Sequence, residues 1–210
     1  MALDTSQRDI GSFIESLCRK AEDLGASEAV ALSVDDIVLD ERTRLKCLVP
    51  VCLDYGVNLM CPPNLPPISK FKEILSCYHK AILMKMLIPL SGVPRNSREK
   101  RGETSAPPTA EDMASVDSAQ KKLHQVVNRV EALCFAAGYH FAAGFLGGTC
   151  CLCRKCVGIS SGLPCRYPLK ARPAMEAMGI DVVATVKKAG LQLSFGQDRD
   201  RSWVGLVLVD

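Results

Sequence analysis

Residues 81–90, with the sequence AILMKMLIPL, form the longest apolar run of the chain. Strands that are buried on both faces of a sheet have such continuous apolar sequences, and Pro89 suits a strand end because it lacks a backbone N–H donor. Lys85 and Pro89 interrupt the run, which is also too short to span a bilayer. The stretch therefore predicts an interior strand of a sheet, in a protein without a membrane segment.

The sequence on both sides of this strand alternates between helical and extended patterns. Apolar residues recur three and four positions apart in residues 10–24 and 123–137, and a glycine follows closely after each apolar stripe, as is common at helix ends. The other predicted elements are strands over residues 29–39, 139–146, 191–195 and 203–209, a short helix over 68–78, and helical stretches from Pro173 and from Ile180. This alternation predicts one α/β domain over residues 1–210, an α/β sandwich around a mixed sheet with two Cys-rich metal-binding loops.

Residues 91–117 differ from the rest of the chain, because they are charged, contain prolines and have almost no large apolar side chains. Basic and acidic residues balance each other over this stretch, whereas an arm that binds nucleic acid is one-sidedly basic. We therefore expect a mobile surface loop or lid here.

The composition is typical of a folded, water-soluble protein, with 48% apolar and 23% charged residues. A net charge of +3 is too small to indicate nucleic-acid binding, and the scattered aromatic residues offer no base-stacking platform. The first residues, MALDTSQRDIGSF, do not resemble a secretory signal, because no basic segment precedes an apolar one. We expect a cytoplasmic protein, in which eleven cysteines exceed the needs of core packing and indicate metal binding.

Four cysteines occur at metal-ligand spacing in the segment GGTCCLCRKCVGISSGLPCRYP. They are Cys150, Cys153, Cys156 and Cys165, separated by two, two and eight residues. Two-residue spacers let successive thiolates surround one metal centre, whereas they give poor disulfide geometry. The spacing is typical of a [4Fe–4S] cluster, and zinc, which usually takes two separate Cys pairs, is the alternative.

Residues next to this motif are expected to support the metal centre without binding it. Gly147 and Gly148 would allow backbone N–H groups to approach the cluster, and Cys151 is out of register with the ligands. Five basic residues surround the motif, namely Arg154, Lys155, Arg166, Lys170 and Arg172. Their charge would offset that of the thiolates and would suit an acidic redox partner protein.

A second group consists of Cys47, Cys52 and Cys61, spaced by four and eight residues and followed by two prolines. A proline directly after the last cysteine is common in ferredoxin-type loops, so we expect a second [4Fe–4S] cluster here. The irregular spacing would equally suit cysteines without a ligand role. The fourth ligand is open: Cys77 and His79 are nearby in the sequence, and Cys77 would also suit the core.

Other patterns that could carry chemistry are weak. His79, His124 and His140 are dispersed and have no neighbouring Cys or carboxylate pattern, so we expect structural roles for them. Arg172 and Glu176 lie one helical turn apart and are expected to pair, or to face a ligand as the polar residues nearest the four-Cys motif.

The two cysteine segments resemble a known family. Residues 47–63, with Tyr55-Gly56 and CPPN, are similar to one half of its pattern, and GYHFAAGFLGGTC with CRYPLKARPAMEAMGIDVVATVKKAG is similar to the other half. The family is a domain-of-unknown-function family described only as predicted metal-binding proteins, common in anaerobic bacteria and archaea. The resemblance covers residues 40 to 195 approximately, and Cys151 and Ala174 depart from it. It implies that the family's cysteines fall on Cys47, Cys52, Cys61, Cys150, Cys153, Cys156 and Cys165, and it implies no reaction.

The sequence thus supports three hypotheses. The first is a cytoplasmic iron–sulfur protein with one or two [4Fe–4S] clusters and a redox or electron-transfer role. The second is a zinc-stabilised binding module without redox function. The third is an enzyme that binds its substrate at an open iron of the three-Cys cluster, with Lys170 or Arg172 as the anion partner.

Overall fold

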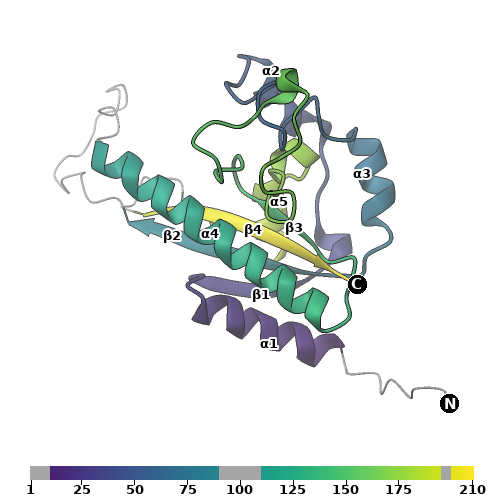
Figure 1. The fold of residues 1–210 in the computed structure, drawn as a ribbon. Coiled ribbons are helices and arrows are strands. Elements are labelled where there is room, and N and C mark those ends of the chain that lie inside the picture. Colours follow the sequence, from purple (N-terminus) through teal and green to yellow (C-terminus); the bar gives the residue numbers. More distant parts are fainter. Residues whose placement is uncertain (1–9, 90–109, 195–199) are drawn as a thin grey trace, which may run out of the picture.

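The computed structural model describes residues 10–89, 110–194 and 200–210 (Figure 1). The helices are α1 (Ile10–Asp23), α2 (Leu45–Leu48), α3 (Ile68–Leu75), α4 (Ala110–Ala136) and α5 (Val182–Lys188). The strands are β1 (Glu28–Ser33), β2 (Lys80–Pro89), β3 (Ala143–Leu146) and β4 (Asp200–Val209). Short 3-10 turns, among them Glu41–Arg44 and Glu176–Met178, connect some of these elements.

The strands form one sheet in the order β1-β2-β4-β3, and each neighbouring pair is antiparallel. β2 pairs with β4 along its whole length, from Lys80 opposite Val209 to Pro89 opposite Asp200, and with β1 on its other side. The apolar run at 81–90 therefore forms an interior strand, as predicted, and the α/β fold class is confirmed. Among the described residues, parallel pairing is limited to an isolated bridge between Leu146 and Ala174.

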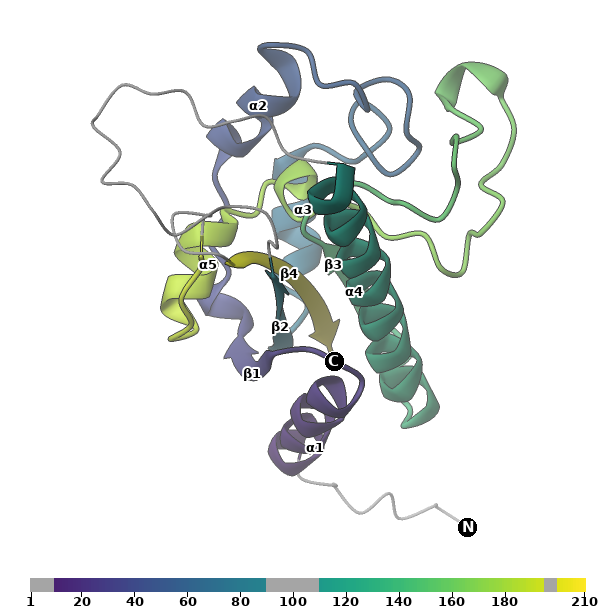
Figure 2. The same cartoon turned by 90° about the vertical axis from the view of Figure 1, so that its left-hand side faces the viewer.

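Helices cover both faces of this sheet (Figures 1 and 2). α1 and α4 pack on one face, where Met84 of β2 and Val207 of β4 belong to the apolar core. The other face has a second core that includes Phe71 of α3, Leu83 of β2 and Val186 of α5. Because alternate residues of a strand point to opposite faces, the two central strands contribute to both cores. This arrangement is the predicted α/β sandwich, but its sheet is antiparallel, so the prediction of a mixed sheet is wrong.

Two predicted segments have different limits in the structure. β1 ends at Ser33, because a 3-10 turn follows it directly. The N–H of Ile37 donates to the Val34 carbonyl at 3.0 Å and closes this turn. α4 begins at Ala110, so residues 110–117 are helical and are not part of a surface loop. The alanines and Glu111 at this helix start are good helix formers, which explains the difference. The rest of the predicted loop, residues 91–109, lies outside the described residues.

The strand predicted for 139–146 is shorter than expected. Gly138 adopts a left-handed backbone with φ 102°, and the next residues form a turn, so β3 begins only at Ala143. Residues 191–194 contact β4 only near Ser202, whose N–H donates to the Ser194 carbonyl at 3.0 Å. They form no strand, and residue 195 of the predicted strand lies outside the described residues.

No helix begins at Pro173. The N–H of Leu146 donates to the Pro173 carbonyl at 3.0 Å, and the N–H of Met175 donates to the Leu146 carbonyl at 2.7 Å. The backbone after Pro173 is therefore bound to the end of β3, and only the short turn Glu176–Met178 follows before α5. The predicted helix after Ile180 is present as α5.

Both Cys-rich segments lie at the same end of the molecule, above the sheet in the views of Figures 1 and 2. The first segment, residues 45–66, leads from the turn Glu41–Arg44 to α3, and the second, residues 147–172, follows β3. We call them the three-Cys loop and the four-Cys loop. The fold thus brings together two loops that are far apart in the sequence.

Candidate metal centre

The cysteines of the four-Cys loop line a single cavity of about 240 Å³. The cysteines that line it are Cys150, Cys153, Cys156 and Cys165. Leu59 and Met60 from the three-Cys loop also line it. The structure therefore brings together the four residues that the spacing groups, and their role as metal ligands stays a prediction.

Backbone N–H groups point at the sulfur atoms of the first and last of these cysteines. The N–H of Tyr167 donates to Cys165 Sγ at 3.4 Å, and the N–H groups of Leu152 and Arg172 are close enough to Cys150 to favour its thiolate. Burial raises the pKa of Cys150, whereas these two N–H groups lower it because they stabilise the thiolate. Leu152 and Tyr167 each lie two residues after the cysteine that they contact, so the local turn itself directs the amide to sulfur.

Gly147 and Gly148 do not supply these amides. The N–H of Gly147 donates to the Val204 carbonyl of β4 at 2.5 Å, and that of Gly148 is near the carboxyl group of Glu176, whose pKa it lowers. The prediction that these glycines direct N–H groups to a metal centre is therefore wrong. Gly147 is instead needed for space, because a Cβ there would lie 2.7 Å from the Val204 carbonyl oxygen.

A polar stripe on α4 holds both ends of the four-Cys loop. Gln120 Nε2 donates to the Thr149 carbonyl at 2.7 Å, at the start of the loop. His124 Nε2 lies 2.7 Å from the Lys170 carbonyl, and Asn128 Nδ2 donates to the same oxygen at 3.1 Å. Gln120, His124 and Asn128 are four residues apart, so they share one face of the helix.

His124 has a cysteine neighbour that the sequence does not reveal. Cys151 Sγ lies 3.8 Å from His124 Nδ1, which contradicts the expectation of an isolated histidine. Because Nε2 faces a carbonyl and must donate, Nδ1 is the acceptor and the Cys151 thiol donates to it. Burial lowers the pKa of His124 and raises that of Cys151, which favours this neutral pair. Cys151 therefore faces α4, which agrees with its being out of register with the other cysteines.

Arg172 pairs with Glu131 of α4 and not with Glu176, so the predicted pair is wrong. Its Nε and Nη2 atoms each donate to a Glu131 carboxylate oxygen at 2.5 Å, and both side chains are largely buried. Arg172 also donates to the carbonyls of Leu169 and Ala171. The guanidinium is thereby engaged within the protein, which removes it as a free anion partner for a substrate.

The three-Cys loop is built from tight turns. The N–H of Cys52 donates to the Cys47 carbonyl at 3.1 Å, and the N–H of Cys61 donates to the Asn58 carbonyl at 3.0 Å. Cys61 is buried, and burial raises its pKa to about 12, with further effects of the negative charges of Asp54, Cys52 and Cys47. The thiols are thus close enough to disfavour each other's ionisation, and a bound cation would reverse that effect.

The two loops contact each other directly. Asn58, which is buried, donates from Nδ2 to the Cys150 carbonyl at 3.2 Å. Gly158 packs so closely on the three-Cys loop that a Cβ there would lie 3.2 Å from the Val57 carbonyl oxygen. Cys150 is also among the charges that raise the pKa of Cys61. The two cysteine groups, which the sequence presents separately, are therefore neighbours.

Cys77 and His79 have other partners. Cys77 is exposed after the end of α3, and its thiol lies 3.6 Å from the Glu73 carbonyl, so it is not a core residue. His79 Nδ1 lies 2.7 Å from Asp210 at the end of β4. Cys18, in contrast, is buried in α1, as its place on the apolar helix face predicts.

Glu176 is a residue of the site whose position the sequence pattern does not reveal. Burial raises the pKa of its carboxyl group, and the N–H groups of Glu176 itself and of Gly148 partly offset that effect. Its Oε2 atom is buried and has no hydrogen-bond partner. The sequence marks Glu176 only as a polar residue near the four-Cys motif that could face a ligand, and it does not reveal the burial of the carboxylate.

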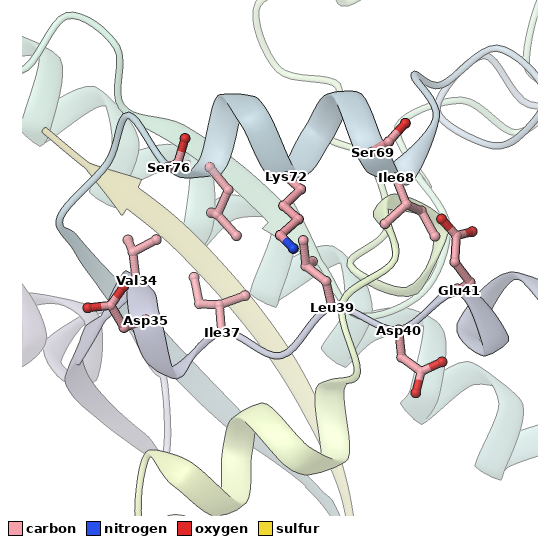
Figure 3. Close-up of a pocket in the computed structure, with 11 residues that line it drawn as sticks. Val34, Asp35, Ile37, Leu39, Asp40, Glu41, Ile68, Ser69, Lys72 and Ser76 are labelled. Carbon is pink, nitrogen blue, oxygen red and sulfur yellow. The ribbon is translucent and has the colours of Figure 1, made fainter.

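A larger cavity, about 570 Å³, lies elsewhere, between α3 and the segment after β1 (Figure 3). Its walls include Val34, Ile37 and Ile68, and Lys72 extends from α3 toward Leu39 (Figure 3). No cysteine lines this cavity, so it is separate from the candidate metal centre.

Among the described parts of the chain, no three His, Cys, Asp or Glu residues are arranged so as to hold a single metal ion. The helices in those parts include none that is long and apolar enough to cross a membrane. No curated protein and no solved structure matches the chain. A family model described as predicted metal-binding protein (DUF2284) matches residues 30–209, which include all seven cysteines of the two loops. Because this match spans most of the chain, the protein belongs to that family of predicted metal-binding proteins.

Proposed function

We propose that the protein is a cytoplasmic iron–sulfur protein with a redox or electron-transfer role. One [4Fe–4S] cluster would be held by Cys150, Cys153, Cys156 and Cys165, and a second by Cys47, Cys52 and Cys61. A [4Fe–4S] cluster supplies one-electron chemistry at a potential set by charge, hydrogen bonds and exposure. The observation that carries the proposal is the cavity that all four cysteines of the four-Cys loop line, with amides directed at two of the sulfurs.

The size of this cavity favours a cluster over a single zinc ion. In a zinc site the sulfurs lie about 2.3 Å from one ion and nearly contact each other. The cavity that the four cysteines help to line measures instead about 240 Å³, several times the roughly 30 Å³ that one water molecule occupies in the liquid. A group of several atoms suits that space, and the family description, which names metal binding, is compatible with it.

The chain's own residues would raise the affinity of the site for an electron. The amides of Leu152, Arg172 and Tyr167 stabilise negative charge on Cys150 and Cys165, and hydrogen bonds to cluster sulfurs raise the reduction potential. Apolar Leu59, Met60 and Leu152 limit the access of water. The direct contact between the loops, through Asn58 and Cys150, would keep two clusters close enough to exchange electrons.

The surface around the cavity suits an acidic redox partner. Arg154, Lys155 and Arg166 are exposed near the cysteines, and Leu163 and Leu169 are exposed in the same loop. Exposed basic and apolar side chains in one loop suit a partner with a complementary acidic surface. Such docking would weaken as ionic strength rises, since salt screens exposed charges.

The decisive experiment is anaerobic purification of the full chain with measurement of iron, acid-labile sulfide and zinc. We expect a brown protein with about four to eight irons and matching sulfide per chain, as one or two cubanes require. Electron paramagnetic resonance (EPR) spectra after reduction with dithionite should then show signals of reduced clusters. A colourless protein with stoichiometric zinc and no sulfide would overturn the proposal and favour a zinc-stabilised binding module.

A further inference from the structure

Three cysteines leave one iron of a [4Fe–4S] cluster without a protein thiolate, so the three-Cys loop needs another ligand or keeps an open position. Cys77 and His79, the nearest candidates in the sequence, contact Glu73 and Asp210 instead. If the protein supplies a fourth ligand, it therefore comes from another segment that the fold brings to the loop.

Glu176 is placed at the junction of the two loops. The N–H of Gly148, near the start of the four-Cys loop, is close enough to its carboxyl group to lower the pKa of that group. Arg44, directly before the three-Cys loop, donates from Nε to the Ala177 carbonyl at 2.9 Å in the turn that carries Glu176, and from Nη2 to the Pro66 carbonyl at the end of that loop. Lys46 and Cys47 are both near enough for their charges to interact with that of the carboxylate.

One oxygen of this carboxylate is unused within the protein. Oε2 is buried and makes no hydrogen bond, although a buried carboxylate oxygen without a partner is costly. The described part of the chain has only three such side-chain atoms, and Glu176 Oε2 is the only carboxylate oxygen among them. A cation at this position would compensate the burial.

We infer that Glu176 is the non-cysteine ligand of the three-Cys loop and binds the fourth iron through Oε2. The inference rests on the proposed iron–sulfur function and completes its second site. Carboxylate is a hard oxygen donor, so it would leave that iron more exchangeable than three thiolate-bound irons. Asp54 is the rival, because its charge also acts on Cys61 and it lines the cavity of the four-Cys loop. Asp54 has no buried, unpartnered oxygen, which favours Glu176.

The test compares Glu176→Gln, Glu176→Cys and Asp54→Asn with the wild-type chain, all purified without oxygen. Ferricyanide removes one electron from a [4Fe–4S] cluster. The iron that no cysteine binds then leaves as Fe²⁺. A three-iron cluster with its own EPR signal remains. We expect Glu176→Gln to lose this iron about tenfold faster than wild type, since loss of supporting groups at metal sites commonly weakens binding that much. Glu176→Cys should keep all its iron and change the EPR spectrum, because a thiolate replaces the carboxylate. Asp54→Asn should resemble wild type.

Two outcomes overturn the inference without affecting the proposed function. One is faster iron loss from Asp54→Asn and not from Glu176→Gln. The other is a Glu176→Cys protein whose EPR spectrum is the same as that of wild type. This second variant tests the inference even if Glu176→Gln fails to fold. A wild-type protein that contains zinc and no iron overturns the proposed function itself, and the inference with it.

Discussion

The four-Cys loop and the three-Cys loop differ in what holds them. The four-Cys loop is bound at both ends to α4, through the side chains of Gln120 and His124, and by the ion pair between Arg172 and Glu131. The three-Cys loop is shaped mainly by backbone hydrogen bonds among its own turns, with support from Arg44 and Asn58. Its apolar side chains are also more exposed, with Leu53 at 93% as the extreme.

This difference shows two ways in which a protein can position the cysteines of a candidate metal site. A loop fixed by a long helix has its sulfur positions determined by the core of the fold, so it can stay ordered before metal binds. A loop fixed by its own turns depends more on what it binds, because few buried apolar contacts oppose its local opening. We therefore expect the metal of the three-Cys loop to be the more labile.

The largest effect should come from replacing one cysteine in each loop. Cys153→Ser should lose the cluster of the four-Cys loop, and Cys52→Ser that of the three-Cys loop, so that each retains about half of the wild-type iron. Chelator treatment of wild type should likewise release the iron of the three-Cys loop first. Iron analysis and EPR spectra measure both effects.

Cys77→Ser is the control for these variants, since Cys77 is exposed outside both loops. It should keep the full iron content. If either loop variant loses all the iron at once, the seven cysteines hold one shared centre and the comparison of two sites is wrong.

A smaller effect is expected when the support of the four-Cys loop is weakened. Glu131→Gln breaks the charge pair with Arg172, whose side chain is 13% exposed, and leaves that guanidinium without its counter-charge. Loss of one partner of a buried pair costs about 3 kcal/mol or more, and partial exposure reduces this to roughly 2 kcal/mol here. Chemical denaturation measures the free energy of unfolding.

Glu73→Gln provides the matched change at an exposed pair. Glu73 contacts Lys70 at 2.7 Å on the surface of α3, where both side chains are mostly solvated. Loss of this ion pair should change the free energy of unfolding by less than about 1 kcal/mol. Equal effects of the two variants would show that the bond between α4 and the four-Cys loop adds little stability.

The smallest effect should follow from removing the link between the loops. Asn58→Ala deletes the hydrogen bond to the Cys150 carbonyl and the one from the Met60 N–H to Asn58 Oδ1. We expect a loss of about 1 kcal/mol in unfolding free energy and faster release of metal from the three-Cys loop. Asn64→Ala, which removes an exposed bond within the same loop, is the control and should leave the release rate unchanged. Faster release from the four-Cys loop alone would contradict the comparison.

The sequence predicts the fold well where local pattern and burial agree. The apolar run at 81–90 forms β2 because a strand with neighbours on both sides is buried on both faces. The helical periodicities correctly predict α1 and the second half of α4, because the apolar face of each helix is the face that packs on the sheet. The pattern fails after Pro173, where hydrogen bonds with Leu146, distant in the sequence, override a local helix signal.

The sequence predicts only the part of the candidate site that follows from the spacing of the cysteines. Spacing groups the four cysteines that line one cavity, and it says nothing of what holds them. The contacts of His124 with Cys151 and of Glu131 with Arg172 join residues that are 27 and 41 positions apart. A single sequence does not show which residue of a loop lies opposite which residue of a helix, so only the structure reveals such contacts.

The strand order has a consequence for when the site can assemble. β3, from which the four-Cys loop departs, pairs within the sheet only with β4, and β4 follows both loops in the chain. A ribosome makes all seven cysteines before it makes the strand that joins β3 to β2. The thiols therefore emerge without the scaffold that positions them, exposed to oxidation and to any metal present. Correct loading becomes a step that follows synthesis of the last strand, and a cell that makes this protein must keep its nascent cysteines reduced until then.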